Sequence, residues 1–177
     1  MLHRTRRRVW APLLLVAAAA LVPAAGANAA TTYQVAGKQI VVDEAAGKYT
    51  MQGGLIGDWS ITSFTEIAKA PIYKGKGTEL FVGCLDVRHD GSCKGDPAGK
   101  LRFRFRYWAS FDAQGGLIWG SCWHPITGGT GAFAGATGVL TMVDTPTANG
   151  VSTSYIGNVT LGGAKSRTRV AAAAAAC

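Results

Sequence analysis

The chain has 177 residues, the size of one ordinary domain. It is 48% hydrophobic and only 16% charged, a composition that allows a buried core and excludes an intrinsically disordered chain. Glycine accounts for 24 residues, about twice the usual share of roughly 7%, but it lacks the three-residue period of collagen.

The first 29 residues have the pattern of a secretory signal peptide. Four arginines lie within residues 1–8, an apolar run covers 11–25, and a small-residue cleavage site follows at 27–29. The apolar run is shorter than the ~20 residues of a membrane span, which makes an uncleaved anchor the weaker alternative. Residues 5–9 also resemble a twin-arginine signal, so the Sec and Tat routes are both open. We predict a secreted protein that has no membrane attachment after cleavage.

The net charge of +8 belongs in large part to this segment. Removal of residues 1–29 takes away four arginines and no acidic residue, which lowers the net charge to +4. A charge this small gives little electrostatic attraction to a polyanion or a membrane surface, so we expect no nucleic-acid partner.

All four cysteines lie after the predicted cleavage site, at Cys84, Cys93, Cys122 and Cys177. Export places them in an oxidising compartment, where disulfides are expected. Cys84 and Cys93 flank a polar, turn-rich stretch, and a bridge between them would contribute on the order of 2–3 kcal/mol. Pairing of Cys84 with Cys122 across neighbouring strands is the alternative. Cys177 follows six alanines and is expected to be unpaired.

A metal site built from these cysteines is a further alternative, with His89 and His124 as the additional ligands. The chain has no C-x-x-C pair, however, and the spacing of Cys122 and His124 is not one that zinc sites use. We predict no metal site and no cofactor.

Residues 30–163 are expected to form one domain made of strands. Residues 30–37 are assigned to a short leader, and turns are expected at 47–57, 74–77, 90–99 and 114–116. Residues 100–112 are the clearest strand, because Leu101, Phe103, Phe105, Tyr107, Ala109 and Phe111 alternate with Arg102, Arg104, Arg106, Trp108 and Ser110. The seven strands predicted in this way are 38–44, 58–68, 78–87, 100–112, 117–124, 137–144 and 151–161.

Helical periodicity is absent after residue 30 apart from the terminal alanines, which belong to a basic and alanine-rich tail at 164–177 that we expect to be disordered. Many strands, frequent glycine turns and no helices predict an all-β fold, either an antiparallel barrel or a β-sandwich.

The most distinctive stretch covers residues 124–140. Its Gly129-x-Gly131-x-x-Ala134 pattern fits a loose dinucleotide fingerprint, but a strand rather than a helix follows it, which argues against a nucleotide site. We expect its glycines to supply positive φ angles or close backbone approach. They are Gly128, Gly129, Gly131, Gly135 and Gly138.

The sequence Gly-Gly-Thr-Gly-x-Phe-x-Gly-Ala-x-Gly at 128–138 resembles a hairpin segment shared by allene oxide cyclases and plant dirigent proteins. With the segments at 83–86 and 122–127, the chain most closely resembles secreted bacterial proteins of the allene oxide cyclase barrel-like type over residues 50–161. This resemblance implies an eight-stranded antiparallel barrel related in shape to lipocalins, with an eighth strand within 49–55. It also implies dimers or trimers, and a mode of action in which a reactive substrate is held in one conformation. It transfers no catalytic residue.

A barrel of eight strands is either filled by side chains or holds one small ligand. Several polar and aromatic residues of the predicted strands could contact such a ligand if they faced the lumen. The ordinary alternatives are a solvated outer face for the arginines, core positions for the tryptophans and a structural role for the histidine. The candidates are Glu66, Glu79, Arg104, Tyr107, Trp119, Trp123 and His124.

We therefore predict a secreted barrel that binds a small apolar molecule, lipid-like or polyketide-like. The alternatives are a cyclase-like or isomerase-like enzyme that controls the conformation of its substrate, and a structural or inhibitory protein with a filled barrel. Hydrolase chemistry is not expected, because the chain has no nucleophile-elbow motif.

N-terminal sequencing of the exported protein tests the signal peptide. We expect the mature chain to begin near Ala30, because the small-residue site ends at Ala29. A chain that still begins at Met1 after export would contradict this prediction.

Overall fold

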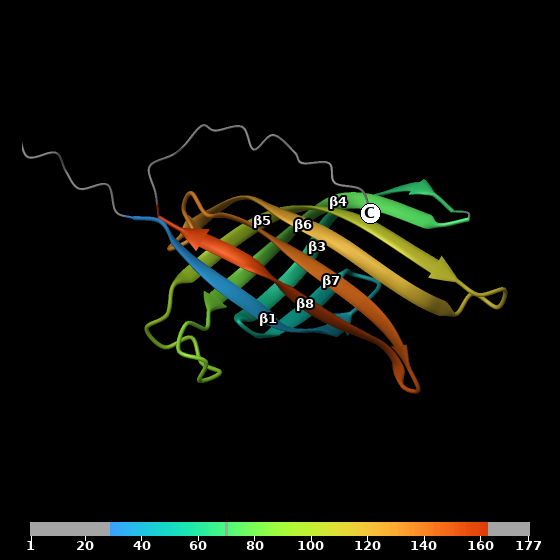
Figure 1. Ribbon diagram of the computed structural model, residues 1–177, viewed down its shortest axis with the longest axis horizontal. Coiled ribbons are helices and arrows are strands. Elements are labelled where there is room, and N and C mark those ends of the chain that lie inside the picture. The colour runs from blue at the N-terminus through green and yellow to red at the C-terminus, as the bar shows by residue number, and fades with distance from the viewer. Residues whose placement is uncertain (1–28, 70, 163–177) are drawn as a thin grey trace, which may run out of the picture.

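A computed structural model describes residues 29–69 and 71–162, which form a closed eight-stranded antiparallel barrel (Figure 1). The predicted tail at 164–177, Cys177 and all of the predicted signal peptide except Ala29 lie outside the described residues. None of the residues that the structure describes belongs to a helix long and apolar enough to cross a membrane. The strands are β1 (Thr31–Asp43), β2 (Lys48–Gly53), β3 (Leu55–Ala68), β4 (Tyr73–Leu85), β5 (Ala98–Phe111), β6 (Leu117–Gly131), β7 (Thr137–Thr147) and β8 (Gly150–Leu161).

Each strand pairs with the next in the chain, and β1 pairs with β8 from Thr31↔Leu161 to Gln39↔Thr153. This last pairing leaves no unpaired sheet edge, so the predicted barrel is confirmed and the β-sandwich is wrong. It also corrects the leader expected at 30–37. Those residues contain few large apolar side chains, but from Thr31 onward they form the half of β1 that pairs with β8.

The turn expected at 74–77 is also wrong, because these residues lie within β4 and pair with 105–108 of β5. Glycine is needed here for close packing rather than for turning. A Cβ at Gly75 would lie 2.5 Å from the ring of Phe64, and one at Gly77 would lie 2.6 Å from the ring of Phe105. The expected turn at 47–57 contains β2, in the region where the family resemblance places the eighth strand.

The glycine-rich segment is mostly strand, since β6 continues to Gly131 instead of ending at His124. At Gly129 a Cβ would lie 2.3 Å from the carbonyl oxygen of Phe133, so only glycine allows this approach. Gly131 has a φ of +64°, a left-handed conformation that glycine adopts without strain. Both roles expected of these glycines are therefore confirmed, and the tight turn itself follows at 132–136.

Alternate hairpins place the connections β1–β2, β3–β4, β5–β6 and β7–β8 at one end of the barrel, which we call the open end. The closed end holds the other connections, the start of β1 and the end of β8 (Figure 1). Large side chains pack the lumen toward the closed end, and the predicted alternation of β5 supplies Leu101 and Phe103 to this core. Its largest members are Met51, Leu55, Trp59, Phe81, Leu85, Leu101, Phe103, Phe133 and Leu140.

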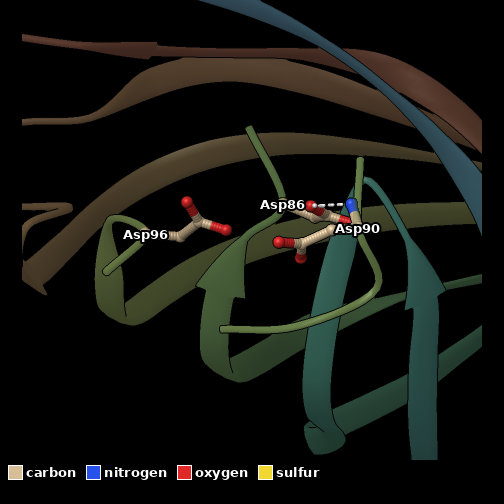
Figure 2. A group of neighbouring side chains, drawn as sticks. All are labelled: Asp86, Asp90 and Asp96. Atoms are coloured by element: carbon tan, nitrogen blue, oxygen red, sulfur yellow. Dashed lines mark hydrogen bonds between the residues drawn. The ribbon is translucent and has the colours of Figure 1, made fainter. Parts of the chain in front are cut away.

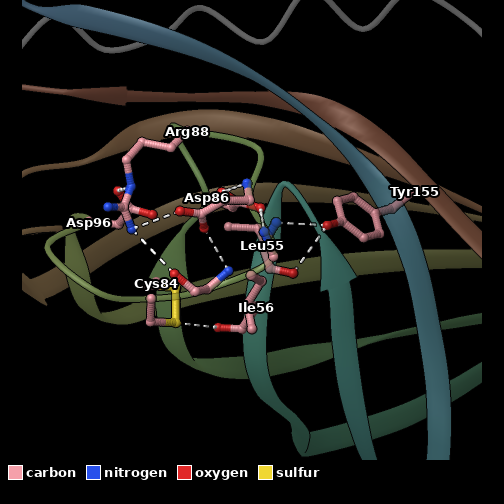
Figure 3. The surroundings of a disulfide bond; sticks show 11 residues. Leu55, Ile56, Cys84, Asp86, Arg88, Asp96 and Tyr155 are labelled. Atoms are coloured by element: carbon pink, nitrogen blue, oxygen red, sulfur yellow. Dashed lines mark hydrogen bonds and ion pairs between the residues drawn. A yellow bond between two sulfur atoms is a disulfide. The ribbon is translucent and has the colours of Figure 1, made fainter.

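A disulfide joins Cys84, near the end of β4, to Cys93 in the β4–β5 loop (Figure 3). The predicted pairing is therefore confirmed. The alternative pairing of Cys84 with Cys122 is wrong, because Cys122 carries a free thiol on β6. The bridge also engages the sulfur atoms of Cys84 and Cys93, two members of the metal set considered as an alternative.

Tyr155 of β8 ties the closed end together from inside the lumen (Figure 3). Its hydroxyl oxygen accepts a hydrogen bond from the backbone N–H of Leu55 at 2.8 Å and donates to the carbonyl of Gln52 at 3.1 Å. This single side chain therefore satisfies backbone groups at the β2–β3 connection, which β1 separates from β8 in the sheet.

Replacing Tyr155 by Phe leaves the buried amide of Leu55 without its acceptor. We expect Y155F to lower the free energy of unfolding by about 1–3 kcal/mol near pH 7, as measured by urea denaturation. Burial also raises the pKa of Tyr155 to about 12, whereas a phenol in an unfolded chain titrates near 10. The neutral phenol stabilises the fold below about pH 10, and this contribution is lost as the pH rises toward about 12.

The wild-type protein should therefore lose stability more steeply than Y155F over that alkaline range. Tyr33→Phe is the matched control, because Tyr33 packs against the same core and its hydroxyl makes no hydrogen bond to a described residue. Equal loss of stability in the two variants would contradict the role given to Tyr155.

Candidate functional site

The open half of the lumen contains a cavity of about 370 Å³. All eight strands contribute to its wall, and aromatic rings form much of it. On β6 the inward-facing residues of this half are small, namely Gly120 and Cys122. The half of the lumen nearer the closed end is instead filled by large side chains. The aromatic members of the wall are Tyr49, Phe64, Tyr73, Phe105, Tyr107 and Phe111, and its polar members include Gln39, Glu44, Glu79, His124, Asp144 and Thr153.

Glu79 of β4 and His124 of β6 lie at the inner limit of the cavity, against the packed core. The Nε2 atom of His124 is 3.1 Å from the Oε2 atom of Glu79, and the two residues are only 1% and 6% exposed. Three aromatic rings surround the imidazole, with centroid distances of 5.6 Å to Trp59, 6.0 Å to Phe105 and 6.5 Å to Phe103. The floor of the cavity is therefore a polar pair set in an aromatic layer.

This pair is close, but the two groups are not aligned for a hydrogen bond. The Oε2 atom of Glu79 and the Nδ1 atom of His124 are both buried without a hydrogen-bond partner among the described residues. Buried polar atoms in proteins nearly always have such a partner, and exceptions are common at sites of function. Both residues line the cavity, so a ligand there would meet polar groups that the fold leaves available.

A second polar group lies closer to the open end, where Thr153 donates a hydrogen bond of 2.6 Å to the Oδ1 atom of Asp144. Gly120 faces this group from β6. A Cβ at Gly120 would come within 2.8 Å of both the Oδ2 atom of Asp144 and the hydroxyl oxygen of Tyr107, so the glycine provides the space that they occupy. Burial raises the pKa of Tyr107, and the neighbouring Asp144 carboxylate raises it further, which keeps the phenol protonated.

The thiol of Cys122 lies in the wall between these two polar groups. Burial raises the pKa of Cys122, and the charges of Glu79 and Asp144 add to this effect. Since the thiolate is the reactive form of cysteine, the side chain acts here as a small apolar part of the wall rather than as a nucleophile.

Of the residues singled out in the sequence, the structure brings Glu79, Tyr107 and His124 together in this cavity. Trp119 and Trp123 are not in it. His124, Cys122 and Gly120 face inward, so Trp123 between them and Trp119 next to them face outward, and the two tryptophans are 43% and 40% exposed. They are therefore not core residues either.

Arg104 is exposed on the outer face of β5, opposite the inward phenylalanines. Glu66 lies near the open end of β3, where it forms an exposed ion pair of 3.7 Å with Lys69. Burial and the adjacent Glu66 carboxylate raise the pKa of Tyr73, so Glu66 stands beside the cavity wall without lining it.

Asp144 and Tyr49 are the main cavity residues that the sequence reasoning missed. Asp144 could have been found, because it follows Leu140 and Met142 at two-residue steps and therefore shares their inward face. Tyr49 was missed because β2 was assigned to a turn.

Three aspartates of the β4–β5 loop form a separate cluster at the closed end (Figure 2), with one oxygen of each within 4.8 Å of the others. Asp86 accepts hydrogen bonds from the backbone N–H groups of Asp90 and Gly91. The guanidinium group of Arg88 forms ion pairs with two of these aspartates. Its Nη2 atom lies 3.3 Å from Oδ2 of Asp90, and its Nε atom lies 3.2 Å from Oδ1 of Asp96. These partners engage one or both oxygens of each carboxylate and shape the loop, while the Oδ2 atom of Asp96 is buried without a hydrogen-bond partner among the described residues.

Comparison of the chain with protein-family models, with curated proteins and with solved structures finds no match.

The raised pKa of Cys122 predicts slow alkylation in the folded protein. We expect iodoacetamide at about pH 8 to modify Cys122 at least about tenfold more slowly in the folded protein than in urea, because little thiolate forms in the fold. The rate should still increase above about pH 10, where an ordinary thiol with a pKa near 8.5 is almost fully ionised. Peptide mass spectrometry of the Cys122 peptide measures this rate, and equal rates in the two states would contradict the prediction.

Proposed function

We propose that this protein is a secreted barrel that binds one small, largely apolar molecule in its lumen. The observation that carries this proposal is the cavity of about 370 Å³, which has a mostly aromatic wall and a few polar groups at defined positions. Ligand sites in proteins typically have this make-up, with apolar area for affinity and sparse polar groups for orientation.

The mouth of the cavity supports the same proposal. Val41, Phe64, Phe111 and Val151 line the cavity near the open end, one from each of its four hairpins, and all are between 44% and 53% exposed. Exposed apolar side chains that gather around an opening are typical of surfaces that meet an apolar partner. A ligand that filled the cavity would cover them.

Secretion is part of the proposal and has two supports. The N-terminal residues have the pattern of a signal peptide. The Cys84–Cys93 disulfide suits an oxidising compartment, since such bonds are rare in the cytosol.

An enzyme of the cyclase or isomerase type is the second candidate, and the Glu79–His124 pair is the observation that favours it. A carboxylate and an imidazole at the floor of an apolar cavity could exchange protons with a bound substrate. The resemblance to allene oxide cyclase barrel-like proteins supports this candidate as well. A filled structural barrel has less support, because only the closed half of the lumen is packed.

Titration with the neutral fluorescent probe N-phenylnaphthylamine tests the binding proposal. We expect one probe to bind per chain and its fluorescence to rise. Ile61→Trp, which adds volume inside the cavity, should weaken binding by about tenfold or more. Ile118→Trp is the matched control, because Ile118 is 51% exposed and does not line the cavity, and it should leave binding unchanged.

Absence of probe binding, or equal binding by wild type and I61W, would overturn the binding proposal. Native mass spectrometry of protein purified from an oxidising compartment then identifies a molecule that co-purifies with the barrel. Recovery of an added ligand in chemically altered form would favour the enzyme over the binding protein.

A further inference from the structure

We propose that the ligand of the lumen cavity carries a positively charged nitrogen, as a protonated amine or a quaternary ammonium group, held between the carboxylates of Glu79 and Asp144. This inference rests on the proposed function, because it names the class of molecule that the cavity accepts.

The wall of the cavity carries more acidic than basic side chains. Three carboxylates, from Glu44, Glu79 and Asp144, line the cavity, and among the described residues that line it there is no lysine and no arginine. His124 is the one basic side chain of this wall, and it can offset one of the three charges at most. Because the barrel wall has a low dielectric constant, the excess negative charge acts over the whole cavity.

The arginines of the barrel do not offset this charge from within. Arg102, Arg104 and Arg106 are exposed on the outer face of β5, while the intervening positions face the lumen. The fold thus separates basic residues outside from carboxylates inside. An apolar carboxylate such as a fatty acid would meet like charges throughout the cavity and would be excluded by them.

The buried Glu79 points to a ligand independently of the charge count. Its side chain is 6% exposed and lines the cavity, and its Oε2 atom lies 3.1 Å from the Nε2 atom of His124 but has no hydrogen-bond partner among the described residues. A nitrogen that carries N–H groups would satisfy this atom directly, and a quaternary ammonium would neutralise its charge.

The second carboxylate lies farther toward the mouth, on β7, three strands along the sheet from the β4 strand that carries Glu79. On β6 the inward positions His124, Cys122 and Gly120 follow one another from the floor upward, and Asp144 is the register partner of Gly120. The missing side chain of Gly120 provides the space in which Asp144 and the hydroxyl of Tyr107 face the lumen at this level. A cationic group placed beside Cys122 would lie between Glu79 and Asp144, both of which act on that thiol.

The aromatic part of the wall suits the same group. Tyr49, Phe105 and Tyr107 line the cavity around these carboxylates, and the face of an aromatic ring attracts a cation. The tyrosines stay uncharged, because burial raises the pKa of both Tyr49 and Tyr107. Carboxylates combined with neutral aromatic rings favour an organic cation over a fatty acid or a neutral lipid.

A metal ion fits this cavity less well than an organic cation. The only cluster of three potential ligands found among the described residues is that of the loop aspartates at the closed end. The carboxylates of the cavity are spread over several levels and separated by apolar side chains, an arrangement that matches an extended organic molecule.

Competition against N-phenylnaphthylamine tests the inference with probes that share one alkyl chain. Decyltrimethylammonium, decylammonium, decanol and decanoate, all below their micelle concentrations near neutral pH, should displace the neutral probe with different affinities. We expect at least one of the two cations to bind about tenfold or more tightly than decanol, and decanoate to bind most weakly. The two cationic arms distinguish a quaternary ammonium from an amine that donates hydrogen bonds.

Two variants locate the effect, and the measured quantity is the ratio of cation affinity to decanol affinity. Asp144→Asn and Glu79→Gln should each reduce this ratio by about fivefold to tenfold. Asp58→Asn makes the same change of charge on the outer face of β3 and should leave the ratio unchanged. Circular dichroism confirms that each variant is folded, and D144N keeps the test valid if E79Q does not fold.

The outcomes separate this inference from the proposed function. If N-phenylnaphthylamine does not bind, the proposed function fails and the inference fails with it. If the neutral probe binds but neither cation is preferred over decanol, or if D144N has the same ratio as D58N, the inference alone is overturned.

Discussion

The antiparallel pairing of β1 with β8 is the contact on which the rest of this structure depends. It closes an eight-stranded sheet, and in a barrel of this size the lumen is just wide enough to be filled by side chains or to hold one small molecule. The inward side chains then decide which outcome applies at each level. Trp59, Phe81 and Phe103 fill the lumen near the closed end, whereas Gly120 and Cys122 leave room near the open end.

The packed half of the barrel stabilises the fold, and the hollow half contains the cavity. The packed half buries most of the large apolar side chains and supplies the stability, together with the disulfide and the hydrogen bonds of Tyr155. The open half buries less and holds the polar groups that a stable core would avoid. Glu79 and His124 mark the boundary, where incompletely satisfied polar atoms rest on aromatic rings. Local departures from ideal packing of this kind are typical of functional sites in otherwise consistent folds.

Sequence reasoning reached the all-β class, the alternation of 100–112 and the Cys84–Cys93 disulfide, because each rests on a local pattern. Predictions from the sequence were wrong where contacts between strands, and not the local residue types, determine the structure. Gly75 and Gly77 resemble turn residues, but they serve the close approach of phenylalanine rings within a strand. The outward position of Trp123 was missed because a period of two separates the faces of a strand without showing which face is inward. In a barrel that is half hollow, even the inward face carries polar residues, so hydrophobicity alone cannot assign it.

The register of β1 against β8 also brings the first and last strands of the barrel together at the closed end. Thr31 and Leu161 are Cα partners at the closed end, so a linker of a few residues could join them. The chain could then be reopened in the β5–β6 hairpin at 112–116, where exposed residues make a tight turn. Such a circular permutant would retain the other hairpins and the disulfide while moving both new termini to the mouth of the cavity. A domain fused there would become a removable cap on the lumen.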